Sequence, residues 1–299
     1  MPSLLLWDDQ GLLNFDIWTK ASTYYPRRCE WEILAKHRHE IVSQFPSKSV
    51  VIELGCGNLS KTAYLLAAAE KEKRRIFYYA LDVSEEALNM NLSVLKDQFV
   101  GSQFISISGL SGTYDDCADW LASSASLPTS TVTFLWLGNS VANLNKVDVS
   151  ALLGQFRLAC QEMSAECNFL ISADSCAEEK RILEAYDPLE GPSRTFLFHG
   201  IHHANRLLGQ NAFSEDEWDA VPNWNQEQHE LRYSYAPKKD LQLDLGQLCI
   251  AIKEKEPIEF FMSAKWTESQ VSSIADHAGL RVGHVWRDSN KEYCELTPE

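Results

Sequence analysis

Apolar and polar positions follow two different periods along the middle of the chain. Short β-branched or aromatic runs, typical of buried strands, alternate with stretches in which apolar residues recur every three or four positions, as in amphipathic helices. The strand-like runs cover residues 50–54, 77–83, 103–108, 131–137 and 168–173, and the helical stretches cover residues 61–69, 84 onward, 114–122 and 149–163. This order predicts an α/β fold built from βαβ units, with a parallel sheet covered by helices on both faces.

The flanking segments have a different pattern. Residues 1–48 are expected to be mainly helical, and residues 178–240 to hold a helical stretch followed by polar, tryptophan-containing loops. Strand- and helix-like runs follow at residues 247–253 (strand), 258–265 (strand), 268–278 (helix), 280–286 (strand) and 292–296 (strand). The last two strands are expected to pair as an antiparallel hairpin across Asp288-Ser289-Asn290.

We therefore expect two parts of unequal size. A Rossmann-like, doubly wound domain with a closing antiparallel hairpin would be formed by residues 49–177 and 265–299. A smaller α+β domain would be formed by residues 1–48 and 178–264. The 299 residues are enough for one large domain with a smaller companion.

Composition and charge narrow the class of protein. Hydrophobic residues make up 45% and charged residues 23%, as in soluble globular enzymes. No apolar stretch reaches the roughly 18 residues that a membrane span needs. The N-terminus lacks the basic flank and cleavage site of a signal peptide, so we expect a cytoplasmic protein with no membrane partner. The net charge of −15 disfavours nucleic acid as a partner, because phosphates are bound by clustered Lys and Arg. Nothing in the pattern specifies an oligomeric state.

Cysteine and histidine spacing gives little support for a metal site. The eight cysteines contain no C-x-x-C pair, so reduced and mostly buried thiols are expected. His199, His202 and His203 have helical spacing and could share a metal ion, but no carboxylate or thiolate partner is identifiable near them in the sequence. We therefore expect no metal.

A glycine turn directly follows the first strand. Residues 53–58 (ELGCGN) lead into a helix, and glycine tolerates positive φ and lets the backbone approach a ligand closely. Asp82 ends the second strand, 25 residues after Gly57, where its carboxylate can accept hydrogen bonds from both ribose hydroxyls of a nucleotide. Doubly wound sheets bind ligands at this edge. An NAD(P) site is the alternative, but its fingerprint needs a third glycine where Ser60 stands.

Lys61 lies at the start of the helix after this turn. A cation there opposes the helix dipole, so we expect it to reach a ligand carboxylate instead. S-adenosylmethionine (SAM) carries such a carboxylate on its methionine part. A solvent-facing lysine is the alternative interpretation.

Several segments match a known family in the expected order. They are residues 6–11, 23–26, 53–62, 81–84, 109–116, 137–144, 185–187, 205–209 and 263–266. On these segments the chain resembles the histidine-specific SAM-dependent methyltransferase family, and looks closest to its fungal branch, which includes 4-dimethylallyltryptophan N-methyltransferases. The resemblance implies a class I SAM-methyltransferase fold, with SAM as cofactor and S-adenosylhomocysteine as product.

The resemblance also implies which residues hold the cofactor. They belong to the glycine turn, the helix after it and the ends of the second and third strands: Glu53, Gly55, Gly57, Lys61, Asp82, Thr113 and Tyr114. Thr113 and Tyr114 would border the adenine. Bacterial members carry an acid where Thr113 stands, so the adenine contact is expected to differ here.

The smaller domain is expected to bind a small-molecule amino-acid acceptor. By resemblance, Asn143 and Tyr24 form the catalytic pair that holds the acceptor's amino and carboxylate groups. The rest of the pocket would be formed by Trp7, Tyr186, Phe261 and Ser263. The alternative interpretations are that Trp7 and Tyr24 only pack the N-terminal helices, and that Asn143 is a helix cap.

Phe261 is the departure that bears most on the substrate. Histidine-methylating members carry a glutamate two residues before the serine, and here that position is Phe261. An imidazole N–H beside a phenyl ring stays unsatisfied, at a cost of about 1–3 kcal/mol. An indole would gain ring packing instead. The sequence thus predicts α-N-methylation of an aromatic amino acid, with tryptophan or 4-dimethylallyl-L-tryptophan first and histidine second. A non-catalytic SAM-binding paralogue and small-molecule O-methylation are the alternatives.

Overall fold

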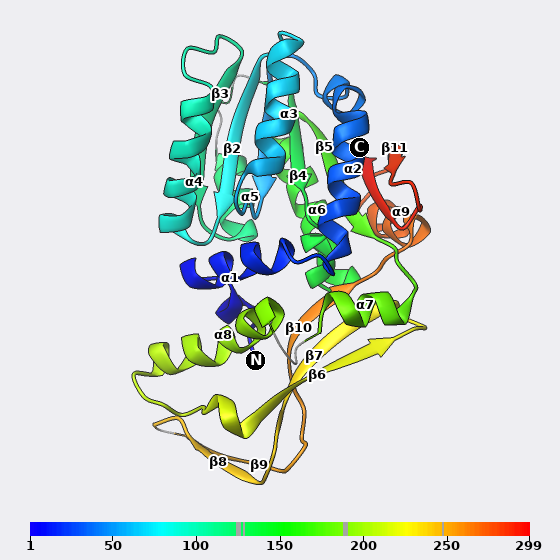
Figure 1. Cartoon of the computed structure of the whole chain (residues 1–299). Coiled ribbons are helices and arrows are strands. Elements are labelled where there is room, and N and C mark those ends of the chain that lie inside the picture. Colours follow the sequence, from blue (N-terminus) through cyan, green and yellow to red (C-terminus); the bar gives the residue numbers. More distant parts are fainter. Residues whose placement is uncertain (124–126, 128, 188–190, 247) are drawn as a thin grey trace. The chain divides into compact units, whose positions relative to one another are not determined.

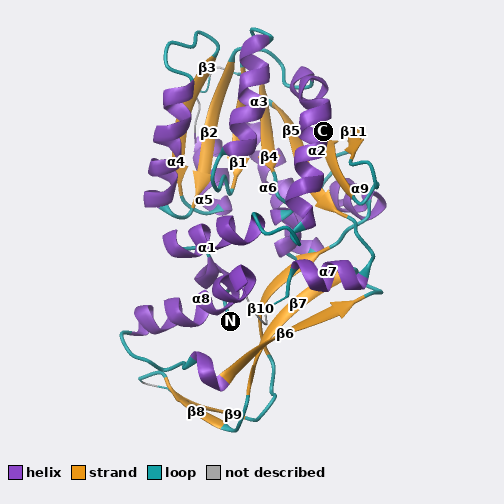
Figure 2. Ribbon diagram, in the orientation of Figure 1, coloured by secondary structure: helices purple, strands orange, loops and turns teal. Residues whose placement is uncertain are grey.

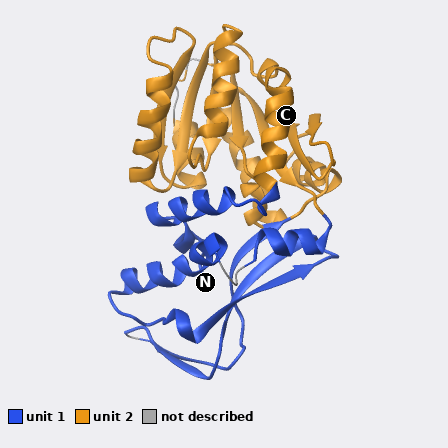
Figure 3. Ribbon diagram, in the orientation of Figure 1, with its two compact units in different colours: residues 1–25, 177–264 blue, residues 26–176, 265–299 orange. Residues whose placement is uncertain are grey.

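Two units make up the chain in the computed structural model, which describes all residues except 124–126, 128, 188–190 and 247 (Figure 1). Unit 1 comprises Met1–Tyr25 and Ala177–Ala264, and unit 2 comprises Pro26–Cys176 and Lys265–Glu299 (Figure 3). Within the described residues, no helix has the length and apolarity to cross a membrane.

Unit 2 is built on a seven-stranded sheet. Its strands are β1 (Ser49–Leu54), β2 (Ile76–Asp82), β3 (Ile105–Ser111), β4 (Thr131–Trp136), β5 (Glu166–Asp174), β11 (Val282–Arg287) and β12 (Tyr293–Pro298). The spatial order is β3-β2-β1-β4-β5-β12-β11. The first five strands in this order are parallel, whereas β12 runs antiparallel to β5 and pairs with β11. The doubly wound sheet and its closing hairpin, both predicted from the sequence, are confirmed.

Helices cover both faces of this sheet. They are α2 (Tyr25–Ser43), α3 (Ser60–Lys71), α4 (Glu85–Gln98), α5 (Tyr114–Ser123), α6 (Lys146–Glu162), α9 (Glu268–His277) and the short 3-10 helix η2 (Ser140–Asn143). In Figure 2, α2, α3 and α4 lie on one face and α5, α6 and α9 on the other. Ser84 caps α4, as expected, by accepting a hydrogen bond from the Ala87 amide at 3.2 Å.

Burial in the centre of unit 2 explains why its strands read as apolar runs. Every residue of β1 and β4 is buried, as is typical of a parallel sheet between two helical layers. The ring centroid of Phe134, in β4, lies 4.5 Å from that of Phe156 and 5.0 Å from that of Phe169. Helix α2 groups with this sheet, although the sequence pattern alone placed residues 26–48 with the smaller part. Its apolar side, with Ile33 and Ile41, is fully buried.

Unit 1 combines helices with antiparallel strands. Its helices are η1 (Ser3–Leu6), α1 (Asp9–Thr19), α7 (Glu179–Ala185), α8 (Gly191–Leu208) and η3 (Glu215–Glu217), and its strands are β6 (Trp218–Asn225), β7 (Glu230–Pro237), β8 (Leu241–Asp244), β9 (Cys249–Ile252) and β10 (Ile258–Ala264). Strands β10, β7 and β6 form one sheet and β8 and β9 another. The first residue of the strand expected at 247–253 lies outside the described residues.

One expectation for unit 1 was wrong. The region predicted as polar loops contains the β6–β7 hairpin, in which Trp218 pairs with Pro237 and Asn225 with Glu230. The signal was present in β7, where Leu231, Tyr233 and Tyr235 recur at every second position and are buried. Polar residues between them hid this period, because only one face of the strand is apolar.

Candidate active site

The glycine turn and the acid that ends β2 lie together in unit 2. Gly55 and Gly57 have φ angles of +71° and +55°, in the region that favours glycine. The Gly57 amide donates a hydrogen bond to Asp82 Oδ2 at 3.2 Å. The parallel pairing of β1 with β2, which sets Leu54 opposite Leu81, brings the two strand ends to the same level. The sequence predicted this pairing of turn and acid, and the structure has it.

The turn faces open space. A Cβ built on Gly57 would meet no atom within 4 Å. Burial raises the pKa of the Asp82 carboxyl, although the backbone amides of Gly57, Ser84 and Val83 act in the opposite direction. A carboxylate at the end of β2, hydrogen-bonded to the turn, can accept from the two hydroxyls of a ribose, so these residues fit the nucleoside part of SAM.

Tyr114 also belongs to this region of unit 2. Its hydroxyl lies 3.3 Å from a Cβ built on Gly55, and its ring packs edge-on against Trp136 with 5.2 Å between centroids. Burial raises the pKa of the Tyr114 hydroxyl to about 12, so it stays protonated. Thr113 is engaged at the start of α5, where its hydroxyl donates to Asp116 at 2.7 Å.

Glu53 lies beneath the turn rather than on its open side. It is buried, and its Oε2 accepts hydrogen bonds from the Thr62 and Tyr78 hydroxyls, each at 2.5 Å. Burial raises the pKa of Glu53 to about 7, and the two hydroxyl donors limit this rise. Glu53 therefore joins β1, α3 and β2 below the place where the turn meets solvent.

Lys61 has a protein partner that sequence reasoning missed. Its Nζ lies 2.9 Å from both carboxylate oxygens of Glu30 in α2. Glu30 also accepts from the Gly138 amide at 2.8 Å. The two residues are 31 positions apart and belong to different helices, so no local sequence pattern predicts this pair.

Asn143 ends η2, in the segment that follows β4. It is half-buried. The cap of the following helix α6 is Asn145, whose side chain accepts from the Asp148 amide at 2.9 Å, so the structure gives the capping role to that residue. Earlier in the segment, Asn139 Oδ1 accepts from the Asp174 amide at 2.9 Å and fixes the segment on β5.

Five of the residues expected around the acceptor, all except Asn143 of unit 2, gather in or beside an aromatic cluster of unit 1. We use this name for eight side chains that are linked to one another by ring contacts: Trp7, Phe15, Trp18, Tyr24, Tyr186, Phe196, Tyr233 and Phe261. Tyr24 and Tyr186 have centroids 5.6 Å apart. Ser263 joins the cluster through its hydroxyl, 3.1 Å from that of Tyr186. Four of the eight (Phe15, Trp18, Phe196 and Tyr233) were not predicted.

Phe261 makes two ring contacts in this cluster. Its centroid lies 6.2 Å from Phe196 and 6.1 Å from Tyr233, and 6% of its surface is exposed. The cluster already contains one buried indole, that of Trp18. Its ring packs against the other aromatic side chains, and its N–H donates to the Ala185 carbonyl at 3.0 Å.

The histidines of α8 do have a carboxylate beside them. Asp8 hydrogen-bonds His199 and forms an ion pair with Arg206 at 2.6 Å, and His203 Nδ1 lies 3.6 Å from the same carboxylate. Among the described residues, Asp8, His199 and His203 are close enough to offer three metal ligands. His203 Nδ1 also donates to the Leu5 carbonyl at 3.0 Å. These bonds hold the N-terminal segment against α8, so the group has a structural explanation without a metal ion.

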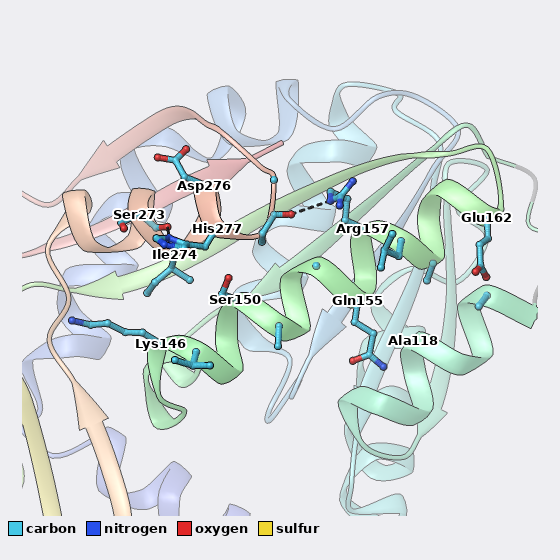
Figure 4. A pocket seen from close by; sticks show the side chains of 18 of the residues that line it. Ala118, Lys146, Ser150, Gln155, Arg157, Glu162, Ser273, Ile274, Asp276 and His277 are labelled. Carbon is cyan, nitrogen blue, oxygen red and sulfur yellow. Dashed lines mark hydrogen bonds between the residues drawn. The ribbon is translucent and has the colours of Figure 1, made fainter.

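A groove of about 1080 Å³ lies elsewhere in unit 2, among helices α5, α6 and α9. Figure 4 shows the side chains of Lys146, Gln155, Arg157 and His277 along it. None of the residues predicted for cofactor or acceptor lines this groove.

The sheet order, the closing hairpin and the paired glycine turn and acid together define a class I SAM-dependent methyltransferase. The chain belongs to the family of histidine-specific, SAM-dependent methyltransferases, whose model matches residues 1–297. SAM is accordingly its cofactor.

Named relatives point to nitrogen as the methylated atom. The chain is 40% identical to the N-methyltransferase benX of Aspergillus terreus, over 98% of this chain and 82% of that protein. It is 32% identical to ergothioneine biosynthesis protein 1 of Neurospora crassa, over 97% of this chain but 32% of that protein. It is 28% identical to the 4-dimethylallyltryptophan N-methyltransferase easF of Trichophyton verrucosum, over 99% of this chain and 87% of that protein. The protein is a SAM-dependent N-methyltransferase.

A solved structure of a DUF574 family protein from Streptomyces avermitilis resembles the chain with a TM-score of 0.44 and 8% identity, over 97% of this chain and 90% of that one.

Proposed function

We propose that this enzyme methylates the α-amino group of an aromatic amino acid, and that its acceptor is tryptophan or 4-dimethylallyl-L-tryptophan. The observation that carries the proposal is Phe261, whose ring contacts are Phe196 and Tyr233. An indole ring gains apolar burial and ring packing in such surroundings. An imidazole would leave a polar N–H or lone pair without a partner there, at about 1–3 kcal/mol.

In this proposal the two units have separate tasks. Unit 1 supplies the ring-binding side chains, namely Trp7, Tyr24, Tyr186, Phe261 and Ser263. Unit 2 supplies the cofactor-binding residues Gly55, Gly57, Lys61, Asp82, Thr113 and Tyr114, with Glu53 supporting the turn from below. Asp82 would accept hydrogen bonds from the ribose, and Lys61 would bind the carboxylate of the methionine part.

The chemistry needs little from the protein beyond orientation. The sulfonium of SAM makes its methyl group strongly electrophilic, and one S–C bond breaks as one N–C bond forms in line. Asn143 and Tyr24 would hold the amino acid so that the amine reacts in its neutral form, and the proton lost from nitrogen goes to a water or hydroxyl. Holding the reactants in this geometry is itself a large part of the rate enhancement.

Two relatives support different acceptors. The easF relative is named for 4-dimethylallyltryptophan and agrees with an aromatic site. The ergothioneine relative, together with the family's description, favours histidine as the second candidate. We favour the first because the Phe261 ring packs against Phe196 and Tyr233, and these two rings offer an imidazole no charged partner.

The test is a screen of the purified enzyme with SAM against tryptophan, 4-dimethylallyltryptophan, tyrosine and histidine, read by mass spectrometry with fragmentation. We expect the fastest product to carry a new methyl group on the α-nitrogen of a tryptophan-type acceptor. Trimethylhistidine as the best product would overturn the argument from Phe261. Binding of SAM without turnover on any amine would favour a non-catalytic paralogue, and methylated phenols would indicate O-methylation.

A further inference from the structure

Glu30 is the centre of a buried polar cluster in unit 2. Its carboxylate accepts two hydrogen bonds from Lys61 Nζ, one from the Gly138 amide and one from the Ser172 hydroxyl, all between 2.8 and 2.9 Å. These partners come from α3, from the turn after β4 and from β5. Glu30 lies in α2, so four separate elements meet at one side chain.

Two carboxyl groups of this cluster share the hydroxyl of Ser172. Ser172 Oγ lies 2.9 Å from Glu30 and 2.8 Å from Glu295, but a hydroxyl has one proton to donate. Burial, followed by the charge of Glu30, raises the pKa of the Glu295 carboxyl well above its usual range. The raised pKa favours the protonated form of Glu295. Glu30 is the carboxyl group that contacts the Lys61 ammonium.

The Lys61 side chain is partly exposed, whereas the side chain of Glu30 is buried. Lys61 keeps 22% of its side chain exposed, whereas Glu30 keeps 3%. An ammonium has three protons, and Glu30 has two oxygens in contact with it, so one N–H is left for a ligand. Gly138, with φ of +75°, passes so close that a Cβ there would lie 3.1 Å from the ammonium nitrogen. The turn and Glu30 together confine the end of a side chain that is otherwise flexible.

We propose that Glu30 is a positioning residue for the cofactor site: it holds the Lys61 ammonium in the one place from which it binds the cofactor's carboxylate. The proposal rests on the proposed function, in which Lys61 binds that group. The direction in which cofactor affinity changes on removal of Glu30 distinguishes a positioning anion from a bystander. A bystander anion beside Lys61 would repel the carboxylate, so its removal would tighten binding. Removal of a positioning anion weakens binding.

The test compares two probes without net charge: S-adenosylhomocysteine, whose amino-acid part carries the carboxylate and an ammonium, and 5′-methylthioadenosine, which lacks both. Calorimetry gives both dissociation constants for the unmodified enzyme, Glu30→Gln, Lys61→Met and the double variant. We expect each single variant to weaken S-adenosylhomocysteine binding about tenfold, the effect of losing one charged hydrogen bond, with methylthioadenosine changed less than about twofold. The double variant should bind no more weakly than Lys61→Met alone, because both residues act through one contact.

Controls separate this inference from folding effects and from the proposed function. Glu32→Gln removes an exposed carboxylate of the same helix, which accepts from the Ser289 amide, and should leave both dissociation constants unchanged. If Glu30→Gln does not fold, Glu30→Asp withdraws the carboxylate by one methylene and should also weaken S-adenosylhomocysteine selectively. Tighter or unchanged binding in the Glu30 variants, with Lys61→Met weakened, would overturn the inference alone. An unchanged Lys61→Met would instead overturn the role of Lys61 in the proposed function.

Discussion

Glu53 offers a quantitative test of how the glycine turn is supported. Its carboxyl is buried under the turn, where Thr62 and Tyr78 donate to one of its oxygens. Burial raises the pKa of Glu53 from its ordinary 4.5 to about 7. The folded protein therefore keeps a proton on Glu53 over a pH range in which the unfolded chain has lost it. Replacement by Gln retains the shape and an oxygen for the two donors but cannot titrate.

The sign of the pH effect follows from proton binding. Between pH 4.5 and about 7 the folded state binds one more proton at Glu53 than the unfolded state, so the free energy of unfolding falls as the pH rises through this window. At about 1.4 kcal/mol per pH unit, the total loss is about 3 kcal/mol. Below pH 4.5 and above about 7 this residue contributes no further slope.

Urea unfolding followed by tryptophan fluorescence measures this difference. We expect the stability of Glu53→Gln relative to the unmodified enzyme to increase by about 3 kcal/mol from pH 4.5 to pH 7.5. The matched control Glu227→Gln, in the exposed β6–β7 turn, should show no such change. Parallel pH profiles for the unmodified enzyme and Glu53→Gln would refute the assignment of a neutral, buried carboxyl.

Substitutions at three further positions test the site. Asn143→Ala should raise the KM for the acceptor about tenfold or more, the loss of one hydrogen bond to a charged group, and leave the dissociation constant of SAM unchanged; equal kinetics would remove Asn143 from the acceptor site. Phe261→Glu should shift the ratio of kcat/KM for histidine over tryptophan upward about 10- to 100-fold, whereas Phe261→Leu should lower both rates with little change in their ratio. Gly57→Ala should cost about 1 kcal/mol of stability, because its φ of +55° disfavours a side chain although no atom lies in the way. It should also weaken SAM binding at temperatures well below its Tm, where the variant is still folded.

The parts of the fold that the sequence predicted are those in which local pattern and burial agree. The strands β1 and β4 are buried on both faces, so their apolar runs were unambiguous. The glycine turn and Asp82 could be paired from sequence because parallel neighbouring strands end at the same edge. The β6–β7 hairpin was missed because its strands are apolar on one face only.

The contacts that could not be predicted join residues far apart in the chain. Glu30 reaches Lys61 through the packing of α2 on the sheet, which no local pattern specifies. Asp8 meets His199 across 191 residues, so the histidine spacing in α8 gave no sign of a carboxylate partner. In the aromatic cluster, the resemblance supplied Trp7 and Tyr24, while Trp18 and Phe196 became visible only once their rings were placed.

Calorimetric titration of SAM into the purified enzyme tests the central claim most directly. We expect one binding site per chain, and a loss of affinity of at least about tenfold when Asp82→Ala removes the acceptor of the ribose hydroxyls. The exposed Asp97→Ala in α4 should bind as the unmodified enzyme does. An enzyme that takes up no SAM, or that binds SAM equally well without the Asp82 carboxylate, would show that the glycine turn and Asp82 do not form the cofactor site.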